Sequence, residues 1–460
     1  MFEKWRLWSP VMRPNSFDDD MEILSEWCQE GAHRVDALPP ASERSDLEME
    51  LVRTYCETVA SVRSQAISTY GETVYRLITN DFRDFLRIEA VLERTRGRFP
   101  CLLPTQAELE TDSRLPLKNK AGHELSIGFS LSQWLANPSV GRHIMASMRL
   151  PKADSIALLP GYQLNGYVDL GVVKLTKSEK RADLTLCNTK SLNAEDIELV
   201  SAMETAVDIV LLDTDTEVGV LRGGPMEHPK YLNKRVFCSG VDLNKLYSGE
   251  LPYLFYVIRE LGMVSKLLRG LWPGDVMSSE TQDRGIEKPW IAAVDGHAIG
   301  GGCQLLLVCD HVVAESGSFM SIPARSEGFI PGLANLRLPQ YVGRRLANRL
   351  IYQNGRVSAD SSEGKLLVDE TARPDDMEKA IEACAARIIN MGTAGIISNR
   401  RAFRHGAEPL EQFRLYMASF CLEQANCMFG REIIGNLERS WVTRPRGGGQ
   451  EPLSNMNLNA

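Results

Sequence analysis

The stretch that decides the fold is Pro289-Trp-Ile-Ala-Ala-Val-Asp-Gly-His-Ala-Ile-Gly-Gly-Gly-Cys-Gln304. Its first half is an apolar run of strand character, and its second half is a turn followed by three glycines that open a helix. Glycines at a strand-to-helix turn let the backbone approach a ligand closely, and the free N–H groups of the helix start can face negative charge. The stretch therefore predicts a buried strand, a turn and a helix, with a ligand at the turn.

A second element of the same kind lies upstream, at Arg235-Val-Phe-Cys-Ser-Gly-Val-Asp-Leu243. Two backbone N–H groups brought together from separate turns form an oxyanion hole, which stabilises an enolate or a tetrahedral oxyanion. Together the two elements predict such a hole. The first stretch ends at Gln304, a neutral amide at a position where such a site often places a carboxylate.

Composition narrows the functional classes. A chain of 460 residues is long enough for two or three domains, and its net charge of −8 argues against a general nucleic-acid binder. Ten cysteines are scattered without a CxxC pair, which is typical of reduced, buried cysteines in a cytosolic protein. The first residues lack an apolar core of signal-peptide length, and no apolar run is long enough to span a bilayer. We expect a cytoplasmic protein with neither a membrane nor a nucleic acid as partner.

Patterning divides the chain into segments of different character. Strand and helix alternate in the middle of the chain, which predicts an α/β core with a largely parallel sheet, flanked by helical segments. The predicted segments are a helical N-terminal domain (1–164), the α/β core (165–375), a C-terminal helical segment (376–443) that serves oligomerisation or completes the site, and a flexible tail (444–460).

Within these segments the individual elements are predicted from periodicity and turn residues. The predicted helices are residues 46–63, 72–93, 194–205, 251–268, 376–389, 395–405 and 410–430. The predicted strands are a hairpin of 168–176 with 182–188, followed by 208–213, 218–222, 236–237 and 290–294.

The two glycine elements, preceded by Cys187-Asn-Thr-Lys-Ser-Leu-Asn-Ala194, resemble the crotonase (enoyl-CoA hydratase/isomerase) superfamily. Cys309-Asp310, Met320-Ser-Ile-Pro323 and Gly328-Phe-Ile-Pro-Gly332 also fit the pattern. The resemblance covers about residues 165 to 390. It implies a fold of stacked ββα turns, acyl-CoA substrates, and homotrimers or hexamers built as dimers of trimers.

The resemblance also implies roles for particular residues. The N–H groups of Val241 and Gly301 would form the oxyanion hole, and Gly300 and Gly302, on either side of Gly301, would contact the substrate. Lys190 and Leu192 match the segment that lines the CoA adenine, and Lys234 and Arg235 are phosphate partners by their charge.

A closer resemblance, over most of the chain, is to the 3,5-dihydroxyphenylacetyl-CoA 1,2-dioxygenases of glycopeptide-antibiotic pathways, which use neither metal nor organic cofactor. It is carried by the helical N-terminal extension and by Arg259-Glu-Leu-Gly262, Arg284-Gly-Ile-Glu-Lys-Pro-Trp290, Gly300-Gly-Gly-Cys-Gln304 and Pro331-Gly-Leu-Ala-Asn-Leu-Arg337. It implies that Glu195, Arg259 and Gln304 surround the dihydroxyphenyl ring and the reacting carbon.

The residues disfavour water addition to an enoyl thioester. A hydratase needs two carboxylates, one to activate water and one to protonate carbon. In the family pattern those positions are occupied here by Gln304 and Ala324, neither of which can take part in proton transfer at neutral pH. Glu327, three residues further on, is a possible substitute for the second carboxylate.

Motifs for metals and organic cofactors are also missing. The seven histidines occur in no His-x-Asp, His-x-Glu or HExxH arrangement. The segment Gly300-Gly-Gly-Cys-Gln-Leu305 fails the dinucleotide pattern GxGxxG at its last position. We therefore expect no metal and no cofactor, with CoA as part of the substrate and O₂ as co-substrate.

The favoured hypothesis is a cofactor-independent dioxygenase of an arylacetyl-CoA, and the alternatives stay open. They are a hydratase, isomerase or thioesterase of the same fold, and a non-catalytic acyl-CoA-binding homologue. Single residues also have structural alternatives. Glu195 can be an acid at a helix start, Arg259 a surface partner of Glu260 or Glu195, and Cys303 a packing residue.

Overall fold

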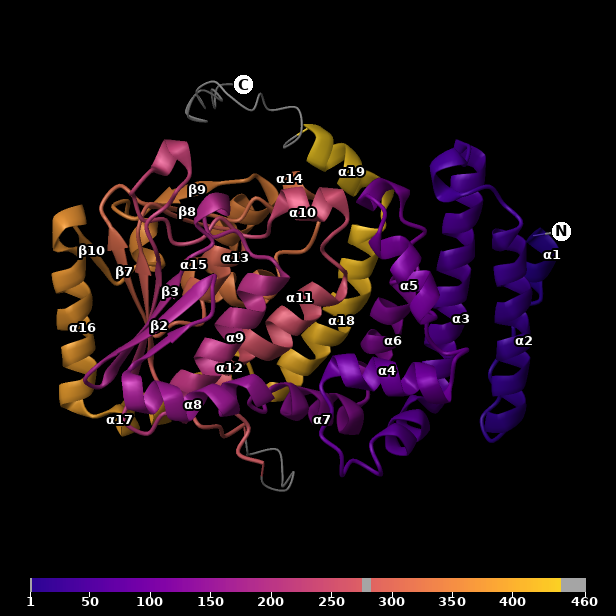
Figure 1. Cartoon of the computed structure of the whole chain (residues 1–460), viewed down its shortest axis with the longest axis horizontal. Helices are drawn as coiled ribbons and strands as arrows, with labels where there is room; N and C mark the ends of the chain where they lie inside the picture. The colour runs from indigo at the N-terminus through magenta and orange to yellow at the C-terminus, as the bar shows by residue number, and fades with distance from the viewer. Residues whose placement is uncertain (1, 275–282, 440–460) are drawn as a thin grey trace.

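The structure is a computed structural model that describes residues 2–274 and 283–439. Figure 1 shows helices of the N-terminal half at one end of the long axis and a β-sheet at the other, with helix α18 (Leu410–Met428) between them. The predicted α/β fold with helical additions at both ends is confirmed. The tail predicted at 444–460 lies outside the described residues.

The N-terminal part is helical, as predicted. Its helices are α1 (Phe2–Leu7), α2 (Phe17–Asp36), α3 (Asp46–Ile78), α4 (Ile88–Arg98), α5 (Gln106–Ser113), α6 (Leu125–Ala136), α7 (Pro138–Met148) and α8 (Ala153–Asn165). A capping box opens α3, in which the Ser45 hydroxyl accepts from the Glu48 N–H and the Glu48 carboxylate accepts from the Ser45 N–H.

The helix predicted at 72–93 is wrong in its bounds. The long helix α3 continues from 46 to 78, and the chain reverses before α4 starts at 88. Asn80, Asp81 and Phe82 make the reversal with φ values of 49°, 57° and 61°, in the left-handed region that ends a helix. Helical periodicity does not register such a local reversal.

The main sheet has seven strands in the order β1-β2-β3-β4-β5-β7-β10. They are β1 (Tyr167–Asp169), β2 (Val173–Ser178), β3 (Arg181–Leu186), β4 (Val218–Gly223), β5 (Trp290–Val294), β7 (His311–Glu315) and β10 (Glu370–Ala372). The predicted hairpin is β2 with β3, but its first arm, predicted as one strand at 168–176, is divided by a turn into β1 and β2, which pair antiparallel. All neighbours from β3 to β10 are parallel. A small second sheet holds β6 (His297–Ile299), β8 (Phe319–Ser321) and β9 (Arg356–Ser358).

The helices of the core cover the sheet and carry the loops at its edge. They are α9 (Ile197–Leu212), α10 (Leu243–Ser248), α11 (Leu254–Arg259), a π-helical turn η5 (Glu260–Val264), α12 (Ser265–Arg269), α13 (Gly301–Leu306), α14 (Ala324–Glu327) and α15 (Ala334–Tyr352). The C-terminal helices are α16 (Met377–Met391), α17 (Thr393–Ala407), α18 and α19 (Arg431–Leu437).

Two predicted strands are wrong. Residues 208–213 form the end of α9 rather than a strand. Most of α9 from 199 to 211 is buried, so its apolar run lacks the periodicity that separates a helix from a buried strand. Residues 236–237 belong to no strand, because the chain there makes only single bridges, such as Cys238 with Ala298.

The predicted C-terminal helices are present, and they join two different cores. Met377 and Ile381 of α16 pack on one face of the sheet with Val220 and Ile291. Helix α18 instead packs on α6 of the N-terminal half (Figure 1), where a Cβ on Gly128 would lie 2.5 Å from the Ala425 side chain. The division of the chain into domains stays a prediction.

Buried charges join the N-terminal half to the core. The Arg87 guanidinium donates to both carboxylate oxygens of Glu204 on α9, at 2.9 and 3.1 Å. The Lys266 ammonium lies 2.9 Å from Glu204 and 2.7 Å from Asp208, and all three of these side chains are buried. These ion pairs fix α9 against α12.

No single helix of the described residues is both long and apolar enough to cross a bilayer. The segments 374–391 and 393–407 reach that length and hydropathy only together, and they are bent by 94° at their junction.

Candidate active site

Three loops meet at the carboxyl ends of the parallel strands β3, β4 and β5. The Glu195 N–H donates to the Gly240 carbonyl at 2.6 Å, and the Asp242 N–H donates to the Glu195 carbonyl at 2.9 Å. The Ile299 N–H donates to the Cys238 carbonyl at 2.9 Å. These bonds join the loop after β3 to the loop after β4, and that loop to the one after β5. Ligands of open α/β sheets bind at this edge.

The two turns predicted to form an oxyanion hole pack against each other. Gly240 and Gly300 have φ values of 79° and 52°, which only glycine adopts readily. The Gly301 nitrogen lies 3.2 Å from the position that a Cβ on Gly240 would take. Among the residues that the structure describes, neither the Val241 N–H nor the Gly301 N–H has a hydrogen-bond partner. The structure thus brings the predicted pair of donors into one place.

A buried ionic cluster lies beside Gly301. The Arg259 Nε and Nη2 atoms donate to the two Glu195 carboxylate oxygens, each at 2.9 Å. Its Nη1 donates to Glu260 Oε1 at 2.5 Å and to Gln304 Oε1 at 3.1 Å. Its Nη2 also donates to the Gly301 carbonyl at 3.0 Å. The predicted group of Glu195, Arg259 and Gln304 is therefore in direct contact.

Burial and charge act in opposite directions on this cluster. Glu195 is fully buried, and Arg259 is 3% exposed. Burial acts to lower the pKa of Arg259, but the charges of Glu195 and Glu260 outweigh it and raise that pKa above its usual range. The guanidinium is therefore cationic at all accessible pH values, held in a forked geometry that suits carboxylate or phenolate oxygen.

Close packing explains why Gly301 and Gly302 are glycines. A Cβ on Gly301 would lie 1.9 Å from the Glu195 carboxylate and 3.0 Å from the Arg259 guanidinium. A Cβ on Gly302 would lie 2.7 Å from the Cys238 carbonyl oxygen. The glycine run thus lets the oxyanion turn lie directly on the ionic cluster.

Two structural alternatives for the cluster residues are wrong. Glu195 is not the acid that caps a helix, because Asp196 does this by accepting from the Leu199 N–H at 2.8 Å. Arg259 does pair with Glu260 and Glu195, but as a buried residue rather than a surface one. The packing role expected for Cys303 agrees with its complete burial.

Glu260 is the functional candidate that sequence reasoning missed. It follows Arg259 directly, yet both side chains reach the same cluster, because Glu260 begins the π-helical turn. Single π-turns inside helices occur frequently at functional sites. Burial raises the pKa of the Glu260 carboxyl, opposed by the charges of Arg259 and Arg337. Arg337, 3.8 Å from Glu260, belongs to the Pro331–Arg337 motif, which was the available signal.

The residues predicted to bind CoA lie on the same edge of the sheet. Lys190 is exposed in the short turn after β3, next to Leu192, which has a φ of 54°. Lys234 is exposed in the loop that follows β4, the strand next to β3 in the sheet. Arg235 is half-buried, and its Nη1 donates to the Gly223 carbonyl at 3.0 Å. Lys190 and Lys234 therefore present their charges to solvent, whereas Arg235 is held against the backbone.

The acid expected after Pro323 in a hydratase is absent, because that position is Ala324, the first residue of α14. Glu327 ends the same short helix, and burial raises its pKa to about 8. Among the described residues this carboxyl has no hydrogen-bond partner, and it is close enough to Tyr256 to affect the phenol pKa. Glu327 is thus the carboxyl on which the alternative hydratase hypothesis depends.

One group has metal-ligand spacing. Ligand atoms of His311, Glu370 and Cys384 lie within 4.8 Å of one another. The Arg387 guanidinium already pairs with the Glu370 carboxylate, and β10, where Glu370 lies, is the edge strand of the sheet. The Arg387 guanidinium therefore already balances the charge of the Glu370 carboxylate, and no metal role is assigned to this group.

Comparison with known proteins identifies the family. The enoyl-CoA hydratase/isomerase family model matches residues 177–424, more than half of the chain. The chain therefore belongs to this family of acyl-CoA enzymes, within the crotonase superfamily.

Three individual proteins illustrate how similar the chain is to members of this family. The chain is 38% identical, over 91% of its length and 95% of the relative, to (3,5-dihydroxyphenyl)acetyl-CoA 1,2-dioxygenase of Amycolatopsis orientalis. It is 27% identical to the crotonyl-CoA hydratase of Syntrophomonas wolfei, over 51% of this chain and 82% of that protein. Among solved structures, an enoyl-CoA hydratase of Mycobacterium avium subsp. paratuberculosis matches 61% of this chain and 100% of its own, with 17% identity and a TM-score of 0.48.

Proposed function

We propose that this protein is a dioxygenase that converts an arylacetyl-CoA and O₂ to the arylglyoxylate and free CoA, without metal or organic cofactor. The first candidate substrate is 3,5-dihydroxyphenylacetyl-CoA, which the name of the Amycolatopsis relative specifies. The observation that carries the proposal is the contact of Arg259 with Glu195, Gln304 and the Gly301 carbonyl. A hydratase would need a carboxylate at the position of Gln304.

The thioester end of the substrate is assigned to the two turns. With its carbonyl oxygen between the Val241 and Gly301 N–H groups, the thioester is stabilised as an enolate when the α-carbon loses a proton. One donor of an oxyanion hole typically lowers the barrier by about 2.7–4 kcal/mol. The aryl ring delocalises the same carbanion, so that a weaker base suffices.

The ring end is assigned to the ionic cluster. Each oxygen of the Glu195 carboxylate uses one lone pair on Arg259 and retains another for a phenolic O–H. Arg259 stabilises charge that develops on a phenol oxygen, and the Gln304 amide can donate or accept. These contacts select a hydroxylated ring and place its α-carbon beside Gly301.

The oxygen step needs no further reactant. The enolate transfers electrons to O₂, and a C–O bond forms at the α-carbon to give a peroxide anion. The distal peroxide oxygen attacks the thioester carbonyl, the C–S bond breaks, and CoA leaves as the thiolate. Cleavage of the O–O bond with loss of the second α-proton gives the arylglyoxylate, so that both atoms of O₂ enter one product.

An oxygen-electrode assay of chelator-treated protein with 3,5-dihydroxyphenylacetyl-CoA tests the proposal. One O₂ is expected to disappear for each free thiol released, and ¹⁸O₂ should place two labelled atoms in the product. Thiol release without O₂ uptake would indicate a thioesterase instead. Activity that requires added iron or copper would refute the cofactor-free mechanism.

A hydratase or isomerase that uses Glu327 is the second candidate, favoured by its buried carboxyl with a pKa of about 8. It would convert an enoyl-CoA without O₂, so the same assay separates the two. Binding of arylacetyl-CoA without turnover would indicate the non-catalytic homologue. We further propose a homotrimer or hexamer, which light scattering can measure.

A further inference from the structure

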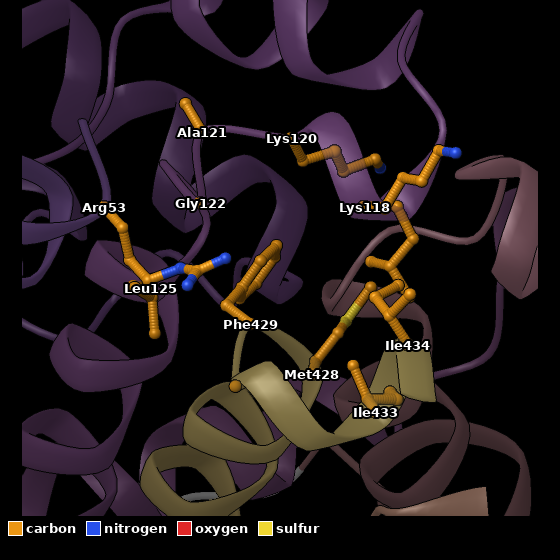
Figure 2. Close-up of a pocket in the computed structure, with 12 residues that line it drawn as sticks. Arg53, Lys118, Lys120, Ala121, Gly122, Leu125, Met428, Phe429, Ile433 and Ile434 are labelled. Carbon is orange, nitrogen blue, oxygen red and sulfur yellow. The ribbon is translucent and has the colours of Figure 1, made fainter. Parts of the chain in front are cut away.

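A cavity lies between the N-terminal helices and the C-terminal end of the described chain. Its volume is about 300 Å³. It is bounded by the short turn at Leu117–Asn119, the start of α6, the end of α18, and α19. Figure 2 shows Lys118 and Lys120 above this space, Met428, Ile433 and Ile434 below it, and the Phe429 ring between them.

The lining combines cations with an apolar wall. The charged residues are Arg53, Lys118 and Lys120, and no carboxylate is among the residues that line the cavity. The wall opposite is formed chiefly by Leu125, Met428, Phe429, Ile433 and Ile434. Such a pairing suits a ligand with an anionic group at one end and an apolar body at the other.

Lys120 is the distinctive residue of this cavity. It is only 8% exposed, and its ammonium has no hydrogen bond or ion pair within the described part of the chain. A buried charge without a partner is costly, so an anion that reaches it gains a strong contact. Arg53, in contrast, already has Glu50 at 3.4 Å, and Lys118 is exposed at the rim.

The buried acid Glu124, whose charge interacts with that of Lys120, forms no direct bond to it. The Glu124 carboxyl accepts from the Tyr253 N–H at 3.0 Å and forms no ion pair with Lys120. Burial raises the pKa of Glu124 to about 7, although the Lys120 charge acts to lower it. At neutral pH Glu124 is thus only partly ionised, and Lys120 keeps capacity for another anion.

We propose that this cavity binds a small arylcarboxylate, with its carboxylate on Lys120 and its ring against Phe429 and Met428. An aromatic ring fits a wall of Phe, Met and Ile, because the thioether and the Phe ring both make favourable contacts with aromatic faces. A bare inorganic anion would leave this wall uncovered. CoA is far too large for a cavity of about 300 Å³.

The cavity is separate from the oxyanion turns but connected to them. It shares no lining residue with the Glu195–Arg259 cluster. Helix α19, which forms one wall, packs on α10, and α10 begins two residues after Val241. The Tyr247 hydroxyl donates to Glu438 at 3.0 Å, which also ties α10 to this end of the chain. An occupant of the cavity therefore contacts α19, which packs on the helix that directly follows the oxyanion donor Val241.

Equilibrium binding tests this inference independently of the proposed reaction. The full chain, saturated with CoA to fill the acyl-CoA site, is titrated in a calorimeter with phenylglyoxylate and with phenylacetate. Benzyl alcohol tests the need for the charge, and inorganic phosphate tests the need for the ring. We expect both arylcarboxylates to bind at least about tenfold more tightly than either control. The tighter of the two shows whether a keto acid, as in the proposed product, or a simple arylacetate is preferred.

Three variants locate the binding. Lys120→Met should weaken it at least about tenfold, which is about 1.4 kcal/mol. Ile434→Trp should fill the cavity and abolish binding, which keeps the test valid if Lys120→Met fails to fold. Lys379→Met, an exposed lysine on α16, should change nothing. The inference is overturned if CoA displaces the arylcarboxylate, if phosphate binds as tightly, or if binding survives in both folded cavity variants.

Discussion

Arg259→Met removes the cation at the centre of the candidate active site while retaining an unbranched side chain. The variant loses the two 2.9 Å bonds to Glu195 and the bond to Gln304. Within the described residues Glu195, which is fully buried, then keeps no cation, whereas Glu260 keeps only Arg337 at 3.8 Å. Removing one partner of a buried ion pair typically costs about 3–5 kcal/mol, and we expect a loss of that size in the free energy of unfolding.

A double-mutant cycle separates the ion pair from simple loss of packing. Glu195→Gln alone should also destabilise the protein, because Glu260 is then the only carboxylate of the described residues that pairs with Arg259. In the double variant neither charge is left unpaired, so its loss should be smaller than the sum of the single losses by about 1–3 kcal/mol. Urea unfolding, followed by the fluorescence of buried Trp290 and Trp134, measures each variant.

The same variant has a functional consequence under the proposed reaction. Arg259→Met should lose the preference for the dihydroxy ring over phenylacetyl-CoA while retaining affinity for CoA itself. The guanidinium does not pair with Glu195 in the folded protein if the unfolding free energy of Arg259→Met lies within about 1 kcal/mol of the wild-type value. The same conclusion follows if the losses of the Arg259→Met and Glu195→Gln variants simply add in the double variant. Equal losses of affinity for both thioesters would refute its role at the ring.

Three further predictions follow from named contacts. Gly301→Ala places a methyl group 1.9 Å from the Glu195 carboxylate and should lower kcat/KM at least about a hundredfold. The control Gly395→Ala, at an exposed helical position with open space around it, should retain activity. Equal losses of activity in the two variants would refute the packing argument. Because folding raises the pKa of Glu327 from 4.5 to about 8, the free energy of unfolding should fall as pH rises through that window, by up to about 1.4 kcal/mol per pH unit. Glu327→Gln should reduce this slope, as measured by urea midpoints at pH 5, 6.5 and 8. An unchanged slope in the variant would mean that the carboxyl is solvated in the folded protein. Phe413→Ala removes a fully buried ring of α18, over which the Arg269 guanidinium lies at 4.9 Å. It should lower the free energy of unfolding by about 3–5 kcal/mol. A loss below about 1 kcal/mol would show that α18 is not part of the core.

The sequence predicted those parts of the molecule that depend on local pattern. The strand at 290–294 and the glycine turn at 300–302 follow from an apolar run and its turn residues, and both are present. The run at 208–213 was misjudged because a helix buried on most sides has the same composition as a buried strand. The alternation of elements was sufficient for the α/β class in spite of that error.

The site was predicted less completely than the fold, for geometric reasons. Gly301, Val241 and Gln304 lie in or beside glycine turns, which a sequence displays directly. The inward position of Glu260 depends on a π-helical turn, for which helical periodicity gives no sign. The cavity near the N-terminal helices combines Lys120 with Phe429, more than three hundred positions apart, and the packing of α18 on α6 brings them together.

The position of α18 has a consequence for how the protein is made. Its side chains Phe413, Met417 and Phe420 are buried in the core formed largely by the first half of the chain, although α18 begins more than 270 residues after the end of α6. The N-terminal helices therefore leave the ribosome with an apolar seam along α6 that stays open until α18 has been translated. Domains generally fold as units, N-terminal first, during synthesis, and exposed apolar surface favours aggregation. This chain must delay that first step, so its yield in a cell should depend on chaperones that cover the seam until α18 arrives.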